Sequence, residues 1–322
     1  MPTARSIISI GTFDGVHAGH AAIVARACAL ASSRPDRPAV TVLAFDPHPA
    51  TVLRPGAAPG RLTTWAQRRV LLETAGADRV VRLEPTPELL GLEADEFVTR
   101  LVADYAPAAL VEGPDFRFGA GRRGDLDLLR RRGAAASFAV HEVAPVEVAL
   151  SDHTVVRASS TLARWLISMG RVTDAQRLLG RPYAVEGVVV RGARRGRELG
   201  FPTANVSTEC LVPGDGVYAG SARLGDGRTY AAAVSVGGNE TFPGAARTLE
   251  AHLLDAPAGA GSGCIDGLSE YGWRLELRFT AYLRDQARFG TVGELVAQIG
   301  RDCARTRELI TVEPPGVLET IA

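Results

Sequence analysis

The first half of the chain alternates short β-branched apolar runs with longer amphipathic stretches. Each apolar run has the length of a buried strand, and the stretch after it repeats its apolar residues at helical spacing. The predicted strands are "SIISIG", "AVTVLAF", "DRVVRLE" and "AALVEG". A helix that ends at about Ser32 is predicted after the first strand, and helices at about 64–75, 93–104 and 125–132 are predicted after the second, third and fourth strands. Strands that alternate with helices form βαβ units, so this half is predicted to be α/β with a parallel sheet.

Two further helices, at about 160–169 and 173–179, close this half, and each is followed by a helix-ending glycine. The pattern then changes to short strands with Gly-rich turns, which is typical of a small antiparallel barrel. These strands are "YAVEGVVVRG", "GVYAGSARL", "YAAAVSVG", "LEAHLLD" and "WRLELRFTAYLR". We therefore expect two domains, residues 1–183 and residues 184–322.

A last helix is predicted to begin after Thr291, because Thr291 and Glu294 have the spacing of a capping box. It is expected to pack against the barrel. The Gly/Ala/Ser-rich stretch 255–272 between two barrel strands is expected to be a mobile loop. The apolar stripe of the last helix consists of Val292, Leu295, Val296, Ile299 and Cys303.

Composition and charge exclude several classes of protein. The chain has 322 residues, 46% of them apolar, which is enough for two cores. Positive and negative residues balance at 36 each, which does not favour a nucleic-acid or membrane partner. All of the cations are arginines and the chain has no lysine. This excludes a P-loop enzyme, a Schiff-base enzyme and the protein-kinase fold, each of which needs a lysine.

The cysteines and the N-terminus indicate an ordinary cytoplasmic protein. The cysteines are scattered without a C-x-x-C pair, which fits neither a disulfide framework nor a zinc site, so buried or inert thiols are expected. The chain enters its first strand without a signal peptide, and no apolar run reaches the ~18 residues of a membrane span. The cysteines are Cys28, Cys210, Cys264 and Cys303.

The string "GTFDGVHAGH" (11–20) joins the first strand to the first helix. His17 and His20 are three residues apart and project from one face of the first helical turn, while Gly19 leaves the backbone open to a ligand. Free N–H groups at a helix start attract anions, so the pattern predicts a phosphate flanked by two imidazoles. "AFDPHP" ends the next strand, and ligands of parallel sheets bind at such strand ends. The other histidines are expected to be structural or surface residues: His141, His153 and His252.

The whole ten-residue string resembles the signature of nucleotidylyltransferases, and "TFDGVH" is similar to one branch, the bacterial bifunctional riboflavin kinase/FAD synthetases. Four more segments, "FDPHP", "GPDFRFG", "SSTLAR" and "GRELGFPTAN", follow in the order of that family. The likeness spans about residues 6 to 311. It implies a Rossmann-like nucleotidylyltransferase domain, then a β-barrel of riboflavin-kinase type with a terminal helix.

In the first domain the resemblance implies adenylyl transfer from ATP to FMN. His17 and His20 would hold phosphate oxygens, Arg164 would meet the departing pyrophosphate, and Asp115 and Phe116 would line the nucleotide and flavin pocket. Such a displacement needs no covalent nucleophile, because catalysis is mostly positioning and charge stabilisation. The other predicted nucleotide- or phosphate-binding residues of this domain are Gly11, Phe13, Asp14, Gly19, Asp46, His48, Ser159, Ser160 and Thr161.

In the second domain Thr203 and Asn205 lie two apart on an extended segment, so both side chains share one face. The resemblance implies that this pair holds Mg²⁺ and the phosphates of ATP. It also implies that Glu250 is the general base that deprotonates the ribityl hydroxyl of riboflavin. A Gly-rich flap over the phosphates would include Gly196, Arg197 and Gly200.

The family likeness thus predicts conversion of riboflavin to FMN and then to FAD, with small-molecule partners only and an undefined oligomeric state. The sequence departs from the family at Leu162, Ala163, Glu240 and Gln286 and in the long 255–272 loop. Because the last three departures lie in the kinase half, a paralogue that acts on a modified flavin or another alcohol is an alternative. A non-catalytic flavin- or nucleotide-binding protein is a second alternative, against which the intact set of predicted catalytic residues argues.

Overall fold

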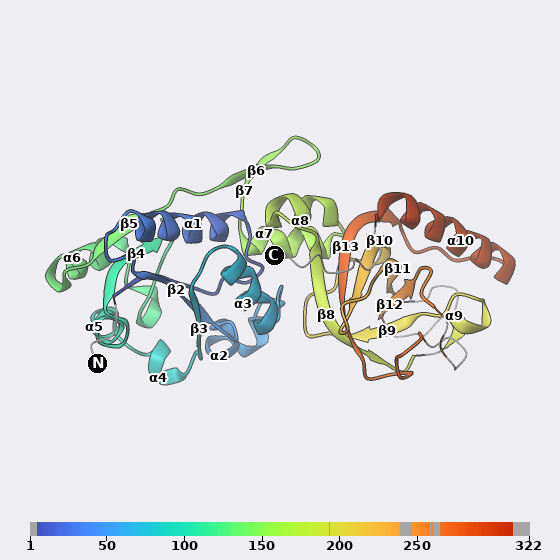
Figure 1. Ribbon diagram of the computed structural model, residues 1–322, viewed down its shortest axis with the longest axis horizontal. Helices are drawn as coiled ribbons and strands as arrows, with labels where there is room; N and C mark the ends of the chain where they lie inside the picture. Colours follow the sequence, from blue (N-terminus) through green and yellow to red (C-terminus); the bar gives the residue numbers. More distant parts are fainter. Residues whose placement is uncertain (1–4, 193, 239–246, 258, 260–264, 312–322) are drawn as a thin grey trace, which may run out of the picture. The chain divides into compact units, whose positions relative to one another are not determined.

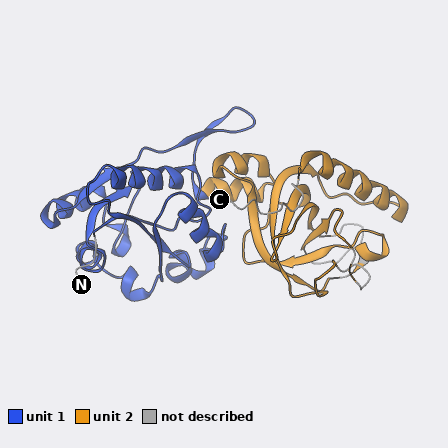
Figure 2. Cartoon of the chain, viewed as in Figure 1, with its two compact units in different colours: residues 1–160 blue, residues 161–322 orange. Residues whose placement is uncertain are grey.

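In the computed structural model, which describes residues 5–192, 194–238, 247–257, 259 and 265–311, the chain forms two compact units, residues 1–160 and 161–322 (Figure 2). Helix α8 (Val172–Leu179) and all but the first residue of α7 (Ser160–Ser168) belong to the second unit. The predicted boundary after residue 183 separates two functional domains, not two compact units, and stays a prediction.

The first unit is built on a five-stranded parallel sheet in the order β3-β2-β1-β4-β5. Strands β2, β3, β4 and β5 are labelled in Figure 1. This confirms the predicted Rossmann-like α/β architecture. Four of the strands are the predicted ones; β5 was not predicted because its four residues are only half-buried and carry no apolar run. The strands are β1 (Ser6–Gly11), β2 (Ala39–Phe45), β3 (Arg79–Leu83), β4 (Pro107–Glu112) and β5 (Ala139–Glu142).

Helices cover both faces of this sheet, as the alternation of side chains along the strands dictates. Val42 of β2 packs with residues of α1 (Ala18–Ser32) and α3 (Trp65–Thr74). Leu43, the next residue, packs on the opposite face with α5 (Ala94–Tyr105) and α6 (Leu126–Ala136). The remaining short elements are α2 (Ala50–Leu53), η1 (Pro55–Ala57), α4 (Pro87–Leu90), η2 (Ala120–Arg122), β6 (Glu147–Ala149) and β7 (Val155–Arg157).

The second unit is a closed antiparallel barrel in the order β10-β11-β12-β9-β8-β13, which confirms the predicted barrel. Residues alternate in burial along the strands, so that Leu249 and Ala251 of β12 are buried while Glu250 between them lines a cavity of about 150 Å³. A single turn of helix, α9 (Arg195–Glu198), precedes β9. The strands are β8 (Tyr183–Val190), β9 (Ala204–Ser207), β10 (Gly216–Leu224), β11 (Thr229–Gly237), β12 (Thr248–Leu253) and β13 (Arg274–Arg284).

The last helix, α10 (Val292–Leu309), begins with the predicted capping box at Thr291 and packs against β10 and β11. The predicted apolar stripe is wrong at Val292, whose side chain is 59% exposed. The buried face lies toward the C-terminal half of the helix and includes Asp302, whose carboxylate pairs with Arg284 at 2.8 Å. Val292 is the first residue of α10 and is exposed with the rest of the first turn, whereas Leu295 and Ile299 line a cavity against the barrel.

The described part of the chain contains three free thiols. Cys28, Cys210 and Cys303 are free, and burial raises the pKa of Cys28 and Cys303. Cys264 lies outside the described residues, as do Glu240 and part of the 255–272 loop. Within the described ranges no helix is both long and apolar enough to cross a bilayer.

Glu112, the last residue of β4, is a buried carboxyl with a defined partner in the neighbouring strand. Its side chain is 2% exposed, and Oε1 accepts a hydrogen bond from the backbone N–H of Ile10 at 2.7 Å. Burial raises the pKa of Glu112 well above the ordinary value of 4.5, because a charge is poorly solvated there. The carboxyl of Glu142 lies directly opposite on β5 and is 40% exposed.

Glu112→Gln is expected to make the stability of the protein less dependent on pH. The unfolded carboxyl ionises near 4.5 while the folded one stays protonated, so folding takes up a proton and wild-type stability falls as the pH rises toward the folded pKa. Glutamine keeps the acceptor oxygen and does not titrate. Urea unfolding at about pH 5 and about pH 8 measures the difference. Glu142→Gln is the matched control, and an equal loss of stability in wild type and Glu112→Gln would contradict the prediction.

Candidate active sites

The first cavity lies where the strand order of the parallel sheet reverses, between β1 and β4. Open α/β sheets bind ligands at this point, outside the carboxyl ends of the strands. The cavity measures about 420 Å³ and is bordered by the start of α1, by the loop after β4 and by the end of β7. Its polar lining and glycines are His17, Gly19, His20, Gly113, Asp115, Arg157 and Ser159.

His17 and His20 form the predicted pair on one face of the first turn of α1. Their rings stack with centroids 3.7 Å apart and planes 23° from parallel. His17 is the N-cap of the helix, and its Nδ1 accepts a hydrogen bond from the N–H of Gly19 at 3.1 Å. The neutral ring therefore carries its proton on Nε2, as a donor. A Cβ at Gly19 would lie 3.1 Å from Cε1 of His17, so glycine lets the ring cover the helix start.

The turn before the two histidines is held in an unusual backbone conformation. Phe13 and Val16 have φ angles of 48° and 39°, which non-glycine residues rarely adopt. Both side chains are buried in the core under α1 and α3, and the ring of Phe13 lies 5.0 Å from that of His20. The backbone carbonyl of Asp14 accepts a hydrogen bond from the hydroxyl of Ser160 at 2.7 Å. Packing and hydrogen bonds thus fix the turn from which the imidazoles project.

The other predicted residues of this half have different surroundings. Asp14 and Asp46 are buried among arginines, and Nδ1 of His48 accepts the N–H of Ala50 at 3.0 Å. Phe116 stacks on Phe118 at 5.5 Å. In the described structure these residues are not part of the cavity wall, and their binding roles stay predictions. The same holds for Gly11, at the end of β1, and for Thr161 and Arg164, which lie on α7 in the second unit.

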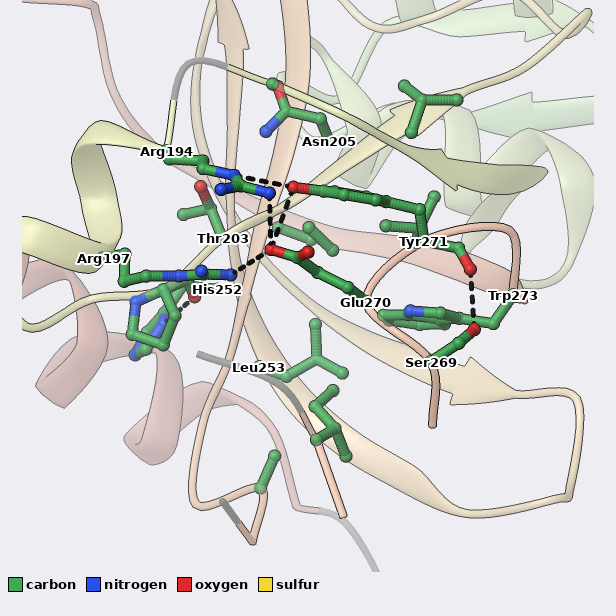
Figure 3. Close-up of a pocket in the computed structure, with 18 of the residues that line it drawn as sticks. Arg194, Arg197, Thr203, Asn205, His252, Leu253, Ser269, Glu270, Tyr271 and Trp273 are labelled. Atoms are coloured by element: carbon green, nitrogen blue, oxygen red, sulfur yellow. Dashed lines mark hydrogen bonds and ion pairs between the residues drawn. The ribbon is translucent and has the colours of Figure 1, made fainter. Parts of the chain in front are cut away.

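Two neighbouring cavities lie against the barrel of the second unit. One, of about 260 Å³, opens between β9, the flap around α9 and the loop before β13 (Figure 3). The other, of about 150 Å³, lies between the barrel and α10; Glu250 is in its wall together with apolar side chains such as Phe289 and Leu295. Thr203 and His252 line both cavities, so the two spaces meet at these side chains.

Thr203, Asn205 and Glu250 are brought together by the pairing of β9 with β12, in which Asn205 lies directly opposite Glu250. The hydroxyl of Thr203 donates to Oε2 of Glu250 at 3.1 Å, and that of Thr248 donates to Oε1 at 3.1 Å. Both hydrogen bonds orient the carboxylate. A Cβ at Gly192 would lie 2.2 Å from Nδ2 of Asn205, so the backbone at residue 192 approaches β9 closely only because it has glycine there.

The donor set around Glu250 fits a hard divalent cation. A hydroxyl, an amide and a carboxylate offer oxygen ligands, which Mg²⁺ prefers, and Mg²⁺ in nucleotide sites takes few protein ligands besides the phosphates. Among the described residues no group of three His, Cys, Asp or Glu side chains is placed to hold a metal.

His252 was expected to be structural or on the surface, but it borders both cavities. Its Nδ1 lies 2.8 Å from the carbonyl oxygen of Pro202, in the segment that carries Thr203. A signal for this placement exists in the sequence. His252 follows Glu250 by two residues on one strand, and residues two apart in a strand share a face.

The flap arginines and the loop before β13 were not predicted to meet. Oε1 of Glu270 accepts hydrogen bonds or ion pairs from Nη2 of Arg194 and Nη2 of Arg197, both at 2.9 Å (Figure 3). The hydroxyl of Tyr271 accepts from Nε of Arg194 at 2.9 Å. The hydrogen bond from Arg197 lowers the pKa of Glu270 and keeps its carboxyl ionised. No periodicity marks these contacts, because Arg197 lies on a single helical turn and Arg194, Glu270 and Tyr271 lie in irregular segments.

Comparison with known proteins agrees with the two kinds of site. Residues 2–159 match the family described as FAD synthetase, and residues 179–310 match the family described as riboflavin kinase. A bifunctional riboflavin kinase/FMN adenylyltransferase of Escherichia coli strain K12 is 33% identical over 98% of this chain and 96% of its own length. The chain belongs to this bifunctional family.

A second relative and a solved structure are similarly close. The bifunctional riboflavin kinase/FMN adenylyltransferase of Pseudomonas fluorescens is 35% identical over 94% of this chain and 92% of its own. A crystal structure described as that of a macrolide-efflux protein from Streptococcus pneumoniae superposes with a TM-score of 0.80 at 29% identity and covers 95% of both chains. The architecture of both units is therefore found in an experimental structure.

Glu270→Gln is expected to tighten the binding of ADP to this family member. The phosphates of a nucleotide in the cavity of Figure 3 would have to displace the carboxylate from Arg194 and Arg197, and the amide competes less well. Because the Glu270 side chain is 34% exposed, we expect a decrease in Kd of only about two- to fivefold by calorimetry. The control is Glu308→Gln, which removes an exposed ion pair with Arg305 on α10. Unchanged or weaker ADP binding in Glu270→Gln would contradict the prediction.

Proposed function

We propose that the chain converts riboflavin to FMN in the barrel unit and FMN to FAD in the α/β unit, with ATP as the donor in both reactions. The observation that carries this proposal is the Thr203–Glu250 hydrogen bond at the junction of two cavities, within the segment that matches riboflavin kinase. The stacked histidines at a helix start, within the segment that matches FAD synthetase, support the second activity.

In the barrel, the two adjoining cavities suit a transfer between two bound substrates. ATP occupies the polar cavity beside the flap, and the flavin occupies the more apolar one against α10. Glu250 takes the proton of the ribityl 5′-hydroxyl while the oxygen of that hydroxyl attacks the γ-phosphorus of ATP, and ADP leaves. Thr203 orients the Glu250 carboxylate from the side that faces the nucleotide. Mg²⁺, held by Thr203 and Asn205, would neutralise charge on the phosphates.

In the α/β unit, an oxygen of the FMN phosphate attacks the α-phosphorus of ATP, and pyrophosphate leaves from the opposite side. Nε2 of His17 and the ring of His20 donate to oxygens of the α-phosphate, where negative charge increases. The free N–H groups at the start of α1 add to this stabilisation. The chain has to supply no covalent nucleophile, since FMN is itself the nucleophile.

The departure from the family at Gln286 has a structural role in the barrel. Gln286, one of the departures from the family, borders the flavin cavity, but its Nε2 donates to the hydroxyl of Ser235 at 2.9 Å and to the carbonyl of Val236 at 3.0 Å. This nitrogen therefore holds the rim of the barrel together. The intact Thr203–Glu250 contact argues against a non-catalytic binding protein.

The direct test incubates the full chain with riboflavin, ATP and Mg²⁺ and separates the flavins by chromatography over time. FMN is expected to appear first and FAD to follow, because the product of the first reaction is the substrate of the second. FAD formation from supplied FMN with riboflavin left unchanged would mean that the barrel acts on another alcohol.

His20→Ala is expected to lower kcat for FMN adenylylation by about 10²–10³-fold, since it removes a donor to the charge that forms in the transition state. Phosphorylation of riboflavin by the same preparation should not change. His141→Ala, on β5 away from the cavity, is the control. Loss of both activities in folded His20→Ala would show that the histidine site is assigned to the wrong reaction.

Glu250→Gln is expected to lower kcat for riboflavin phosphorylation by about 10²–10⁴-fold, because the amide cannot take up the proton. FAD formation from supplied FMN should stay at the wild-type rate. Glu276→Gln, which changes a carboxylate of β13 outside both cavities, is the control. Full kinase activity in Glu250→Gln would exclude this residue as the base.

A further inference from the structure

Arg68 is a buried arginine that no part of the proposed reaction uses. It lies on the first turns of α3, and its side chain is 3% exposed. Its Nη1 donates to the carbonyl of Thr12 at 3.0 Å and to the carbonyl of Phe45 at 2.9 Å. Thr12 follows β1, and Phe45 ends β2. One guanidinium nitrogen therefore joins the carboxyl ends of two neighbouring parallel strands, from which the loops with His17 and His48 begin.

The remaining nitrogens of Arg68 hold the first loop to the segment before α3. Nη2 lies 3.3 Å from Oδ1 of Asp14, and Nε donates to the hydroxyl of Thr63 at 3.3 Å. That hydroxyl donates to Oδ1 of Asp14 at 2.9 Å and accepts the N–H of Gly15 at 3.2 Å. The backbone N–H groups of Leu62 and Thr63 also donate to Asp14. These hydrogen bonds attach Asp14 and Gly15, and therefore the turn, to the segment that precedes α3.

The charges around Arg68 make its position specific. Asp46, 1% exposed, lies 3.5 Å from Nη2 of Arg68, 3.1 Å from Arg61 and 2.6 Å from Arg82. Asp14 and Asp46 thus face the same guanidinium, Asp14 on the first loop and Asp46 on the second. Without Arg68 the two buried carboxylates would lose the cation between them, and burying unpaired charge is costly. A flat guanidinium can serve two carbonyls and two carboxylates at once, which an ammonium cannot.

We propose that Arg68 is a positioning residue for adenylyl transfer. It sets the separation of the two loops and the orientation of the Asp14–His17 turn, and through the Asp14 carbonyl it also sets the hydroxyl of Ser160. Arg68 does not line the cavity, so it acts through these groups and does not touch a substrate. The inference rests on the proposed role of His17 and His20 in the same reaction.

The test compares Arg68→Gln with Arg69→Gln in the full chain. Arg69 is the next residue of α3; it is 56% exposed and pairs only with Glu73 in the described structure. Small displacements of reacting groups cost about 10²-fold in rate, so Arg68→Gln should lower kcat for FMN adenylylation by about 10–100-fold. The KM values for FMN and ATP should stay within about twofold, because the substitution removes no contact with the bound substrates. Riboflavin phosphorylation in the same tube is the internal standard, and Arg69→Gln should match wild type.

Activity is expressed per folded site, with the folded fraction taken from the urea-unfolding signal of each preparation, so that a smaller folded fraction does not count as lower kcat. Arg68→Lys restores the charge and should recover part of kcat. If Arg68→Gln does not fold, Thr63→Val tests the same network, because it keeps the shape of the side chain and removes the hydroxyl; a loss of about three- to tenfold in kcat is expected. Unchanged kcat per site in the folded variants, or a parallel loss of kinase activity, would overturn the inference.

His20→Ala is measured in parallel to separate the two hypotheses. A large loss in His20→Ala with wild-type kcat in Arg68→Gln overturns the role of Arg68 alone. Wild-type kcat in His20→Ala overturns the assignment of the histidine site, whereas the kcat and KM values of Arg68→Gln still decide whether Arg68 positions the loops.

Discussion

In the first unit, two backbone carbonyl groups at the carboxyl ends of neighbouring parallel strands, those of Thr12 and Phe45, are partly buried where the ligand loops begin. A buried polar group without a partner is costly, so these ends need donors from elsewhere. Arg68 supplies them from α3 and is itself neutralised by Asp14 and Asp46. The loops are therefore rigid where they leave the sheet, which lets a turn with unusual backbone angles present two stacked imidazoles at a helix start.

In the barrel, the functional side chains are positioned by strand register instead of a buried ion pair. Pairing of β9 with β12 places Asn205 opposite Glu250, and the hydroxyls of Thr203 and Thr248 hold the two carboxylate oxygens. Leu249 and Ala251 of β12 are buried in the core, so the residues that alternate with them on the other face of the strand are available to ligands. His252 shares that other face. One strand thus contributes both to the core of the barrel and to the junction of two cavities.

The absence of lysine has a structural consequence in both units. Where a single cation has to join several acceptors, arginine offers planar, divergent donors that an ammonium lacks. Arg68 bonds to backbone and carboxylate groups at once, and Arg194 and Arg197 converge on one oxygen of Glu270. In each place the guanidinium links segments that are distant in sequence.

The sequence alone determined the strands and helices with strong periodicity, the two architectures and the pairs that lie close along the chain, such as His17 with His20. These features depend on local spacing, which a single sequence shows directly. Short, half-exposed elements such as β5 were not predicted because they have no apolar run. The burial of Asp46 among three arginines, the place of His252 at both cavities and the contact of Glu270 with the flap were decided only by the tertiary structure. Each of these joins segments far apart in the chain, and no local pattern records which distant side chain a buried charge or an irregular loop will meet.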